Sequence, residues 1–91
     1  MGFIRRIKKK RQIKNELTKH IGEVLLHLRQ KKNSSMRDVS NGSGLSTAFI
    51  CQIENGESSP SADTLVKLSA FFSVSVGYFF KDFDFEKFLD K

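Results

Sequence analysis

Apolar residues recur every three or four positions in several stretches of the chain, and short polar segments separate these stretches. The first stretch runs from about Thr18 to Lys32 and places five apolar side chains on one stripe: Leu17, Ile21, Val24, Leu25 and Leu28. Side chains at this spacing share one face of an α-helix. We therefore expect a helix with one buried face, ended by the polar residues 33–35.

Four shorter helices are expected after this break. The pattern predicts them, in chain order, over residues 36–41, 47–55, 62–72 and 76–80. A serine stands before each one, where a hydroxyl can cap the first turn: Ser34 or Ser35, Ser46, Ser61 and Ser75. Gly56 is placed to end the third helix. The sequence thus predicts an all-α fold with five helices.

The last eleven residues, 81–91, carry three phenylalanines among acidic side chains. Phe83 and Phe85 alternate with acidic residues, which is typical of a strand, whereas Phe85, Phe88 and Leu89 have helical spacing. Both alternatives remain open for this segment.

Residues 36–56 have the pattern of a helix-turn-helix, in which two short helices cross at a tight turn. Ser40 is small where the second helix must approach the first, and Gly44 can adopt the left-handed conformation of the turn. Leu45 is expected to fill the corner, while Ile50 and Ile53 face inward. This motif makes double-stranded DNA the leading candidate partner.

Positive charge is concentrated at the N-terminus. The chain has 16 Lys and Arg against 10 Asp and Glu, a net charge of +6. Residues 1–14 hold seven of the basic residues and no acidic one: Arg5, Arg6, Lys8, Lys9, Lys10, Arg11 and Lys14. The remainder is close to neutral, so we expect DNA contact first from an N-terminal arm, residues 1–16.

Length and composition limit the other possibilities. Ninety-one residues make one small domain, and the single Cys51 suits a reducing compartment. No apolar run approaches the roughly 20 residues of a membrane span, and the first ten residues lack the apolar core of a signal peptide. We expect a cytoplasmic protein with no membrane partner.

The chain resembles the Xre/Cro/cI-type helix-turn-helix regulator family over residues 21–80. The similarity rests on Ile21-Gly22, Leu28-Arg29, Val39-Ser40, Gly44-Leu45-Ser46, Phe49-Ile50, Gln52-Ile53-Glu54-Asn55-Gly56, Pro60-Ser61, Thr64-Leu65, Leu68, Val74-Ser75-Val76 and Tyr78-Phe79-Phe80. It implies a five-helix lambda-repressor-like domain over residues 17–80, with a C-terminal extension over 81–91. It also implies a dimeric regulator, a repressor, that reads a pseudo-palindromic operator with the helix at 47–55.

The resemblance assigns base contacts to the outward side chains of this helix. Gln52 can pair with an adenine edge through its amide, and Thr47 and Ala48 offer methyl contacts to thymine. Phe49 is ambiguous, since a half-buried position between the helices competes with direct base contact. Cys51 is expected to be a passive small residue.

Phosphate contacts are expected from helix ends and the loop after the third helix. The assigned residues are Ser35, Met36, Arg37, Ser46, Asn55 and Ser58. Met36 departs from the family pattern, because glutamine often occupies that position and a methionine side chain cannot bind phosphate. Its backbone amide and the neighbouring Arg37 are the remaining candidates.

Two structural predictions remain, the first from the resemblance and the second from the three phenylalanines in the acidic segment that follows the matched residues. Arg29 and Glu54 are expected to form an ion pair between the first and third helices. Phe83, Phe85 and Phe88 are expected to form the dimer contact, and the alternative is that they fold back onto the fourth and fifth helices of their own chain.

No enzymatic site, cofactor, metal site or small-molecule ligand is predicted. His20 and His27 lack partner ligands at matching positions and are expected to be ordinary surface or packing residues. An alternative to a DNA-binding regulator is a protein-interaction module, such as an antitoxin, on the same fold. Operator sequence and target genes do not follow from the sequence.

Overall fold

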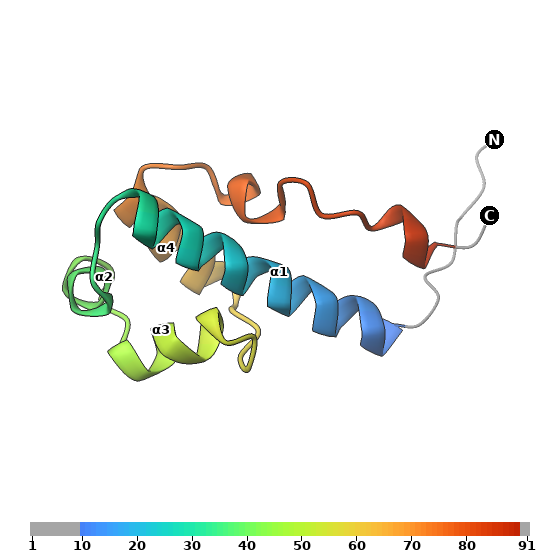
Figure 1. Cartoon of the computed structure of the whole chain (residues 1–91), viewed down its shortest axis with the longest axis horizontal. Coiled ribbons are helices and arrows are strands. Elements are labelled where there is room, and N and C mark those ends of the chain that lie inside the picture. The colour runs from blue at the N-terminus through green and yellow to red at the C-terminus, as the bar shows by residue number, and fades with distance from the viewer. Residues whose placement is uncertain (1–9, 90–91) are drawn as a thin grey trace.

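A computed structural model describes residues 10–89 and contains four α-helices followed by two 3-10 helices (Figure 1). Their bounds are α1 Lys10–Lys31, α2 Met36–Ser43, α3 Thr47–Glu54, α4 Ala62–Phe72, η1 Val76–Phe80 and η2 Glu86–Phe88. No helix in this range has the length and apolar character needed to cross a membrane.

The helical character is confirmed, but the prediction of five α-helices is wrong in one element. Residues 76–80 form the 3-10 helix η1, whose N-cap residue, Ser75, makes no side-chain hydrogen bond to it. A segment of five residues that contains Gly77 gains little from α-helical hydrogen bonds. The tighter 3-10 turn still brings Phe79 into the core, where it is 0% exposed.

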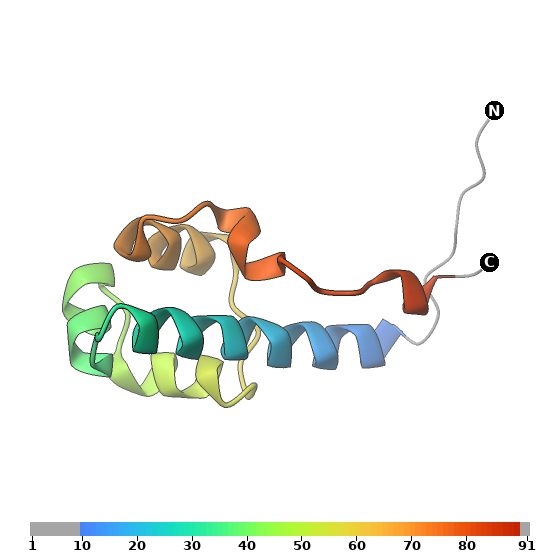
Figure 2. The same ribbon diagram turned by 45° about the horizontal axis from the view of Figure 1, so that its top comes forward.

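Helix α1 is the centre of the fold. It contacts α3 on one side and η1 on another, and α2 contacts both α3 and α4. In Figure 2, α3 lies below α1, whereas α4 and η1 lie above it. The side chains that these elements bury together include Leu25, Ile50, Ile53, Leu68 and Phe72, all 0% exposed.

Serine caps define where three of the helices begin. Ser35 accepts a hydrogen bond from the Asp38 backbone N–H, and Asp38 accepts one from the Ser35 N–H, which is a complete capping box. Ser46 accepts from the Phe49 N–H at 3.1 Å, and Ser61 caps α4 in the same way. The predicted helix starts at Met36 and Thr47 are therefore confirmed.

The turn between α2 and α3 also has its predicted geometry. Gly44 is left-handed, with φ 82°, and its N–H donates to the Ser40 carbonyl. Leu45 is 9% exposed and fills the corner. Figure 1 shows α2 end-on and α3 from the side, so the two helices cross steeply. Helix α2 extends to Ser43, two residues beyond the prediction, because the Ser43 hydroxyl donates to the Val39 carbonyl at 2.6 Å and supports the last turn.

Helix α1 begins at Lys10, eight residues before the predicted start at Thr18. Residues 10–16, which were assigned to the N-terminal arm, are therefore helical. Lys, Arg, Gln and Glu are good helix formers, and periodicity of apolar residues cannot detect a helix that is polar on most sides. Contacts with the C-terminal segment add a second stabilising factor that sequence spacing does not contain.

The segment 81–89 runs back along the N-terminal half of α1, on the same side as η1 (Figures 1 and 2). It forms neither the strand nor the full helix that the pattern allowed, but an irregular stretch that ends in η2. Phe88 is 2% exposed, and its ring stacks on Phe83 with centroids 6.2 Å apart. Packing against α1, rather than local periodicity, therefore determines this conformation.

Candidate nucleic-acid interface

The outer face of α3 presents three small or polar side chains. Thr47, Ala48 and Gln52 are all exposed, whereas Ile50 and Ile53 on the opposite face are 0% exposed. Because Ile50 and Ile53 pack in the core, they set the rotation of α3 about its own axis. The outer face of α3 therefore has one orientation. A major groove is wide enough to admit a helix, and these three side chains would then point at base edges.

Phe49 is half-buried and packs against the core cluster. Its ring therefore supports the junction between helices, and only its exposed edge remains for a DNA contact. Cys51 is also half-buried, and the Asn55 side-chain amide donates to its sulfur at 3.5 Å. Asn55 is the C-cap of α3 and is exposed, so it stays on the surface where a phosphate contact was predicted.

The loop after α3 supports Gln52. The Ser58 hydroxyl donates to the Gln52 side-chain oxygen at 3.3 Å, and the Gln52 backbone carbonyl accepts from the Glu57 N–H at 2.8 Å. Ser58, predicted as a phosphate contact, donates its hydroxyl proton to the Gln52 amide in this structure. The sequence carries no signal for this contact, because it depends on how the loop folds back.

The amino end of α2 carries two of the predicted phosphate contacts, Ser35 and Arg37, and both are exposed. Met36 is half-buried and packs against the core, so its side chain is directed away from any phosphate. The Ser35 N–H donates to the Asp38 carboxylate and lowers its pKa. A lowered pKa means that this capping box stabilises the fold above the ordinary pKa of aspartate, and the contribution is lost as pH falls through the lowered value.

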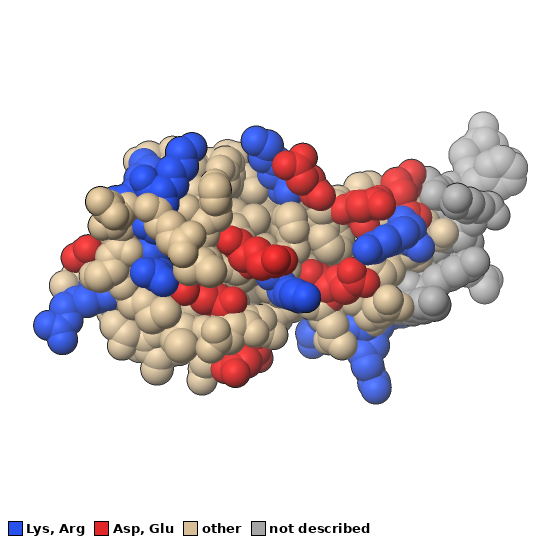
Figure 3. All heavy atoms as spheres, viewed as in Figure 1, with Lys and Arg blue, Asp and Glu red and all other residues tan. Residues whose placement is uncertain are grey.

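Positive charge on the described surface gathers at the corner between α1 and α2. Figure 3 shows Lys and Arg at this end of the molecule, while Asp and Glu lie over the middle of α1. Lys31, Lys32 and Arg37 belong to this corner and are exposed. Two residues of the predicted arm, Lys10 and Arg11, are exposed on the first turn of α1, and Arg5, Arg6, Lys8 and Lys9 lie outside the described residues.

Arg29 and Glu54 connect α1 to the end of α3. The Arg29 Nε donates to Glu54 Oε2 at 2.7 Å and its Nη2 to Oε1 at 3.0 Å, which is a two-pronged pair. A third bond runs from Nη1 to the Ser34 carbonyl at 3.2 Å. The Glu54 side chain is 5% exposed, and its bond to Arg29 raises the pKa of the guanidinium. The pair fixes the position of the C-terminal end of α3 along α1.

Gly22 makes a second fixed contact between the same helices. A Cβ atom at this position would lie 2.3 Å from the Ile53 carbonyl oxygen and 2.9 Å from that of Glu54. Only a residue without a side chain allows α1 to approach the C-terminal end of α3 this closely. Gly22 and Arg29 together set the orientation of α3.

The three residues of the predicted dimer contact differ in exposure within the chain. Phe88 is buried within its own chain, and the half-buried Phe83 stacks on Phe88 and lies at a tilt against His20. Phe83 contacts His20 of α1, whereas the alternative prediction named the fourth and fifth helices. Phe85 is 53% exposed and is the only one of the three that stays on the surface.

His20 and His27 behave as surface and packing residues. His20 is half-buried, and its Nε2 lies 2.9 Å from the Lys81 carbonyl oxygen, while His27 is exposed. Within residues 10–89 no three His, Cys, Asp or Glu side chains come together as metal ligands would. The contact of His20 with the C-terminal segment was not predicted, because it joins positions 61 residues apart.

Comparison with known proteins agrees with this geometry. The model of the HTH_3 helix-turn-helix family matches residues 25–79. Among solved structures, an HTH_3 family transcriptional regulator from Vibrio cholerae is 31% identical, with a TM-score of 0.73 over 77% of this chain. The present chain spans only 39% of that protein's length. No curated protein matches the sequence.

Two further solved structures share the fold. The restriction-modification controller protein C.AhdI from Aeromonas hydrophila has a TM-score of 0.67 at 24% identity, covering 69% of this chain and 96% of that one. The clp gene regulator ClgR from C. glutamicum has a TM-score of 0.65 at 22% identity, covering 69% and 82%. Since the family model covers more than half of the chain and the matched segment contains α2, α3 and their glycine turn, this chain belongs to the HTH_3 helix-turn-helix family.

Proposed function

We propose that this chain is a sequence-specific DNA-binding regulator of transcription, with α3 in the major groove. The observation that carries the proposal is the outer face of α3, where Thr47, Ala48 and Gln52 are exposed beside the amino end of α2. Arg29 and Gly22 hold this face in one orientation, as base recognition requires. The Vibrio cholerae relative, a transcriptional regulator, supports the same function.

The phosphate contacts are proposed at the positions that the sequence predicted and that remain on the surface. These are Ser35, Arg37, Ser46 and Asn55, with backbone amides of the first turns of α2 and α3 contributing where side chains do not. Ser46 uses its hydroxyl oxygen for the Phe49 N–H, so its hydroxyl proton is the group that would donate to a phosphate.

Selection of bound fragments from genomic DNA tests this function directly. A regulator should bind its selected site at least about 10³-fold more tightly than random duplex at physiological salt. Equal affinity for selected and random DNA would contradict the proposal and favour the alternative, a protein-interaction module on the same fold.

Gln52→Ala should weaken binding to the selected site by roughly 1–3 kcal/mol and relax discrimination at one base pair. The physical reason is the loss of two amide hydrogen bonds to one base edge. Titration of the variant against sites with each base pair changed in turn measures both effects.

Gln30→Ala is the matched control, because Gln30 is exposed on α1 away from the outer face of α3. This variant should bind like the unmodified chain. If Gln52→Ala keeps the full base preference, Gln52 does not read sequence.

We also propose a dimeric repressor that reads a pseudo-palindromic operator. One recognition helix contacts few base pairs, whereas a two-fold dimer places two such helices about 34 Å apart, one turn of the duplex. A stable interface needs about 800 Å² per partner, which the single exposed Phe85 cannot supply. The exposed apolar side chains Val76 and Phe80 on η1 and Val66 on α4 are the further candidates for contact with a second copy.

Phe80→Lys should shift the chain from dimer to monomer in sedimentation velocity, because a buried lysine at the interface would leave an unpaired charge. Phe80 is 41% exposed, so the substitution should leave the monomer folded. Phe85→Lys is the control for surface charge and should remain dimeric. If the chain stays dimeric with Phe80→Lys and becomes monomeric with Phe85→Lys, the interface lies in the C-terminal extension instead.

A further inference from the structure

The segment Lys81–Leu89, here called the C-terminal clasp, holds the first half of α1. The His20 Nε2 lies 2.9 Å from the Lys81 carbonyl oxygen, and the His20 and Phe83 ring centroids are 5.3 Å apart. The Lys87 ammonium donates to Glu16 at 3.1 Å and lowers the pKa of that carboxyl. Phe88, 2% exposed, is the buried anchor of the segment.

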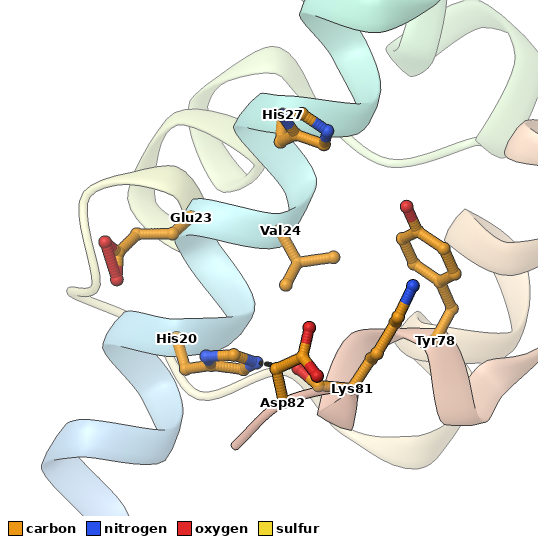
Figure 4. Close-up of a pocket in the computed structure, with 7 residues that line it drawn as sticks. All are labelled: His20, Glu23, Val24, His27, Tyr78, Lys81 and Asp82. Carbon is orange, nitrogen blue, oxygen red and sulfur yellow. Dashed lines mark hydrogen bonds between the residues drawn. The ribbon is translucent and has the colours of Figure 1, made fainter. Parts of the chain in front are cut away.

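Figure 4 shows the start of this contact in detail. His20 from α1 points toward the segment that carries Lys81 and Asp82, and the dashed line marks its bond to the Lys81 carbonyl. An open groove of about 390 Å³ lies on the C-terminal side of this bond, between α1 and Tyr78. The groove therefore lies beside the C-terminal part of α1, which belongs to the core. The clasp lies beside the N-terminal part.

The first half of α1 has little other support. The fully buried residues of α1 begin at Thr18 and Leu17 still packs against the core, so residues 10–16 extend past it. The first turn contains no acidic residue, although it holds Lys10 and Arg11. Positive side chains at a helix N-terminus are repelled by the helix dipole, and a short helix without packing is marginal in water. The contacts of the clasp offset these two disadvantages.

This extension presents basic side chains on the side of α3. Arg11 precedes Gly22 by 11 residues, which is close to three turns, so both lie on one face of α1. Gly22 is the point where α1 meets the end of α3. At about 1.5 Å per residue, Arg11 stands roughly 16 Å beyond that point along α1. Figure 3 shows Lys and Arg side chains projecting below the N-terminal half of α1, and Figure 2 shows α3 on the same side of α1, below its C-terminal half.

We propose that the C-terminal clasp positions Arg11 on a second DNA contact, the phosphate backbone beside the groove that α3 enters. Phe88 and His20 are its positioning residues. The inference rests on the proposed DNA-binding function. Because Arg11 is held on a helix rather than a flexible chain, it contacts phosphate without first losing backbone freedom.

Phe88→Ala in the full chain tests the clasp, with Phe85→Ala as the matched control. Both variants remove a phenyl ring from the same segment without changing charge, but Phe88 is buried and Phe85 is 53% exposed. We expect amide exchange of Lys14–Leu17 to accelerate at least tenfold in Phe88→Ala, while that of Leu25–Leu28 changes little. The amides of residues 10–13 are not informative, because the first four of a helix have no intrahelical partner. Phe85→Ala should leave both regions unchanged.

DNA binding gives the second readout, with a random-sequence duplex as the probe. Each phosphate neutralised contributes roughly −0.9 to the slope of log K against log salt. Arg11→Gln should therefore make the slope shallower by about one in the full chain, and Phe88→Ala should do the same or more. When Arg11→Gln is added to Phe88→Ala, the slope of log K against log salt should show no further change. Phe88→Leu, which keeps an apolar anchor, should restore the slope.

Three outcomes would overturn the inference. Unchanged exchange in Phe88→Ala would show that α1 does not need the clasp. Faster amide exchange in Phe88→Ala with an unchanged salt slope would show that the N-terminal part of α1 does not contact DNA. Additive effects of Arg11→Gln and Phe88→Ala would show that Arg11 acts independently of the clasp. If the full chain binds no duplex, the proposed function and the DNA contact fail together, while amide exchange still decides whether the clasp orders α1.

Discussion

Gly22→Ala should destabilise this protein by about 3 kcal/mol or more, although alanine is normally the better helix residue. In an exposed helix the same substitution stabilises by about 1 kcal/mol, because glycine loses more backbone freedom on folding. Here the new Cβ would lie 2.3 Å from a backbone carbonyl of α3, and backbone cannot move aside as a flexible side chain can. Helix α1 must shift away from α3, which opens the core at Ile53.

Urea unfolding at constant protein concentration measures this effect. Gly77→Ala is the control, since a Cβ there meets only the Ser75 hydroxyl, at 3.8 Å, and it should change stability by less than about 1 kcal/mol. In a domain of this size each kcal/mol corresponds to about 4–8 °C in Tm, so the two variants should be well separated in thermal melts. A Gly22→Ala variant as stable as the unmodified chain would show that α1 and α3 do not approach this closely.

Arg29→Met should destabilise the fold by about 3–5 kcal/mol, because it leaves the Glu54 carboxylate buried without a counter-charge. Glu54 is 5% exposed and receives two hydrogen bonds from Arg29, so little water can replace them. Glu54→Leu should destabilise the fold by a similar amount, because it leaves the Arg29 guanidinium without its carboxylate partner. The double variant should recover most of the loss, since two apolar side chains can replace a buried pair at little cost.

The double-mutant cycle separates a desolvated pair from a surface contact. We expect a coupling energy of at least about 2 kcal/mol between Arg29 and Glu54. The pair Lys67–Asp63 on α4 is the control, because its side chains are 48% and 76% exposed, and its coupling should stay below about 1 kcal/mol. Additive losses at Arg29 and Glu54 would show that the two side chains do not depend on each other.

The turn and the caps could be predicted because their causes are local. Gly44 is needed for a positive φ, and Ser35, Ser46 and Ser61 each bond to a backbone amide three residues later. Such interactions connect neighbours in the sequence, so residue type and spacing are sufficient to identify them. The outward face of α3 follows in the same way from the buried positions of Ile50 and Ile53.

The details of the candidate site could be predicted only in part. Exposure of Thr47, Ala48 and Gln52 follows from helical periodicity, whereas the bond from Ser58 to Gln52 depends on the path of a loop. The inward position of Met36 likewise depends on the packing of α2 against the core. No pattern within one helix contains this information.

By itself, the sequence determined the helical class, the glycine turn between α2 and α3, the helix caps and the inner face of α3, since each arises from interactions within a few residues. Only the tertiary structure decided the start of α1 at Lys10 and the position of the C-terminal clasp. These features depend on contacts such as Glu16 with Lys87, 71 residues apart. Their free energy comes from packing and pairing between distant segments, which composition and periodicity do not specify.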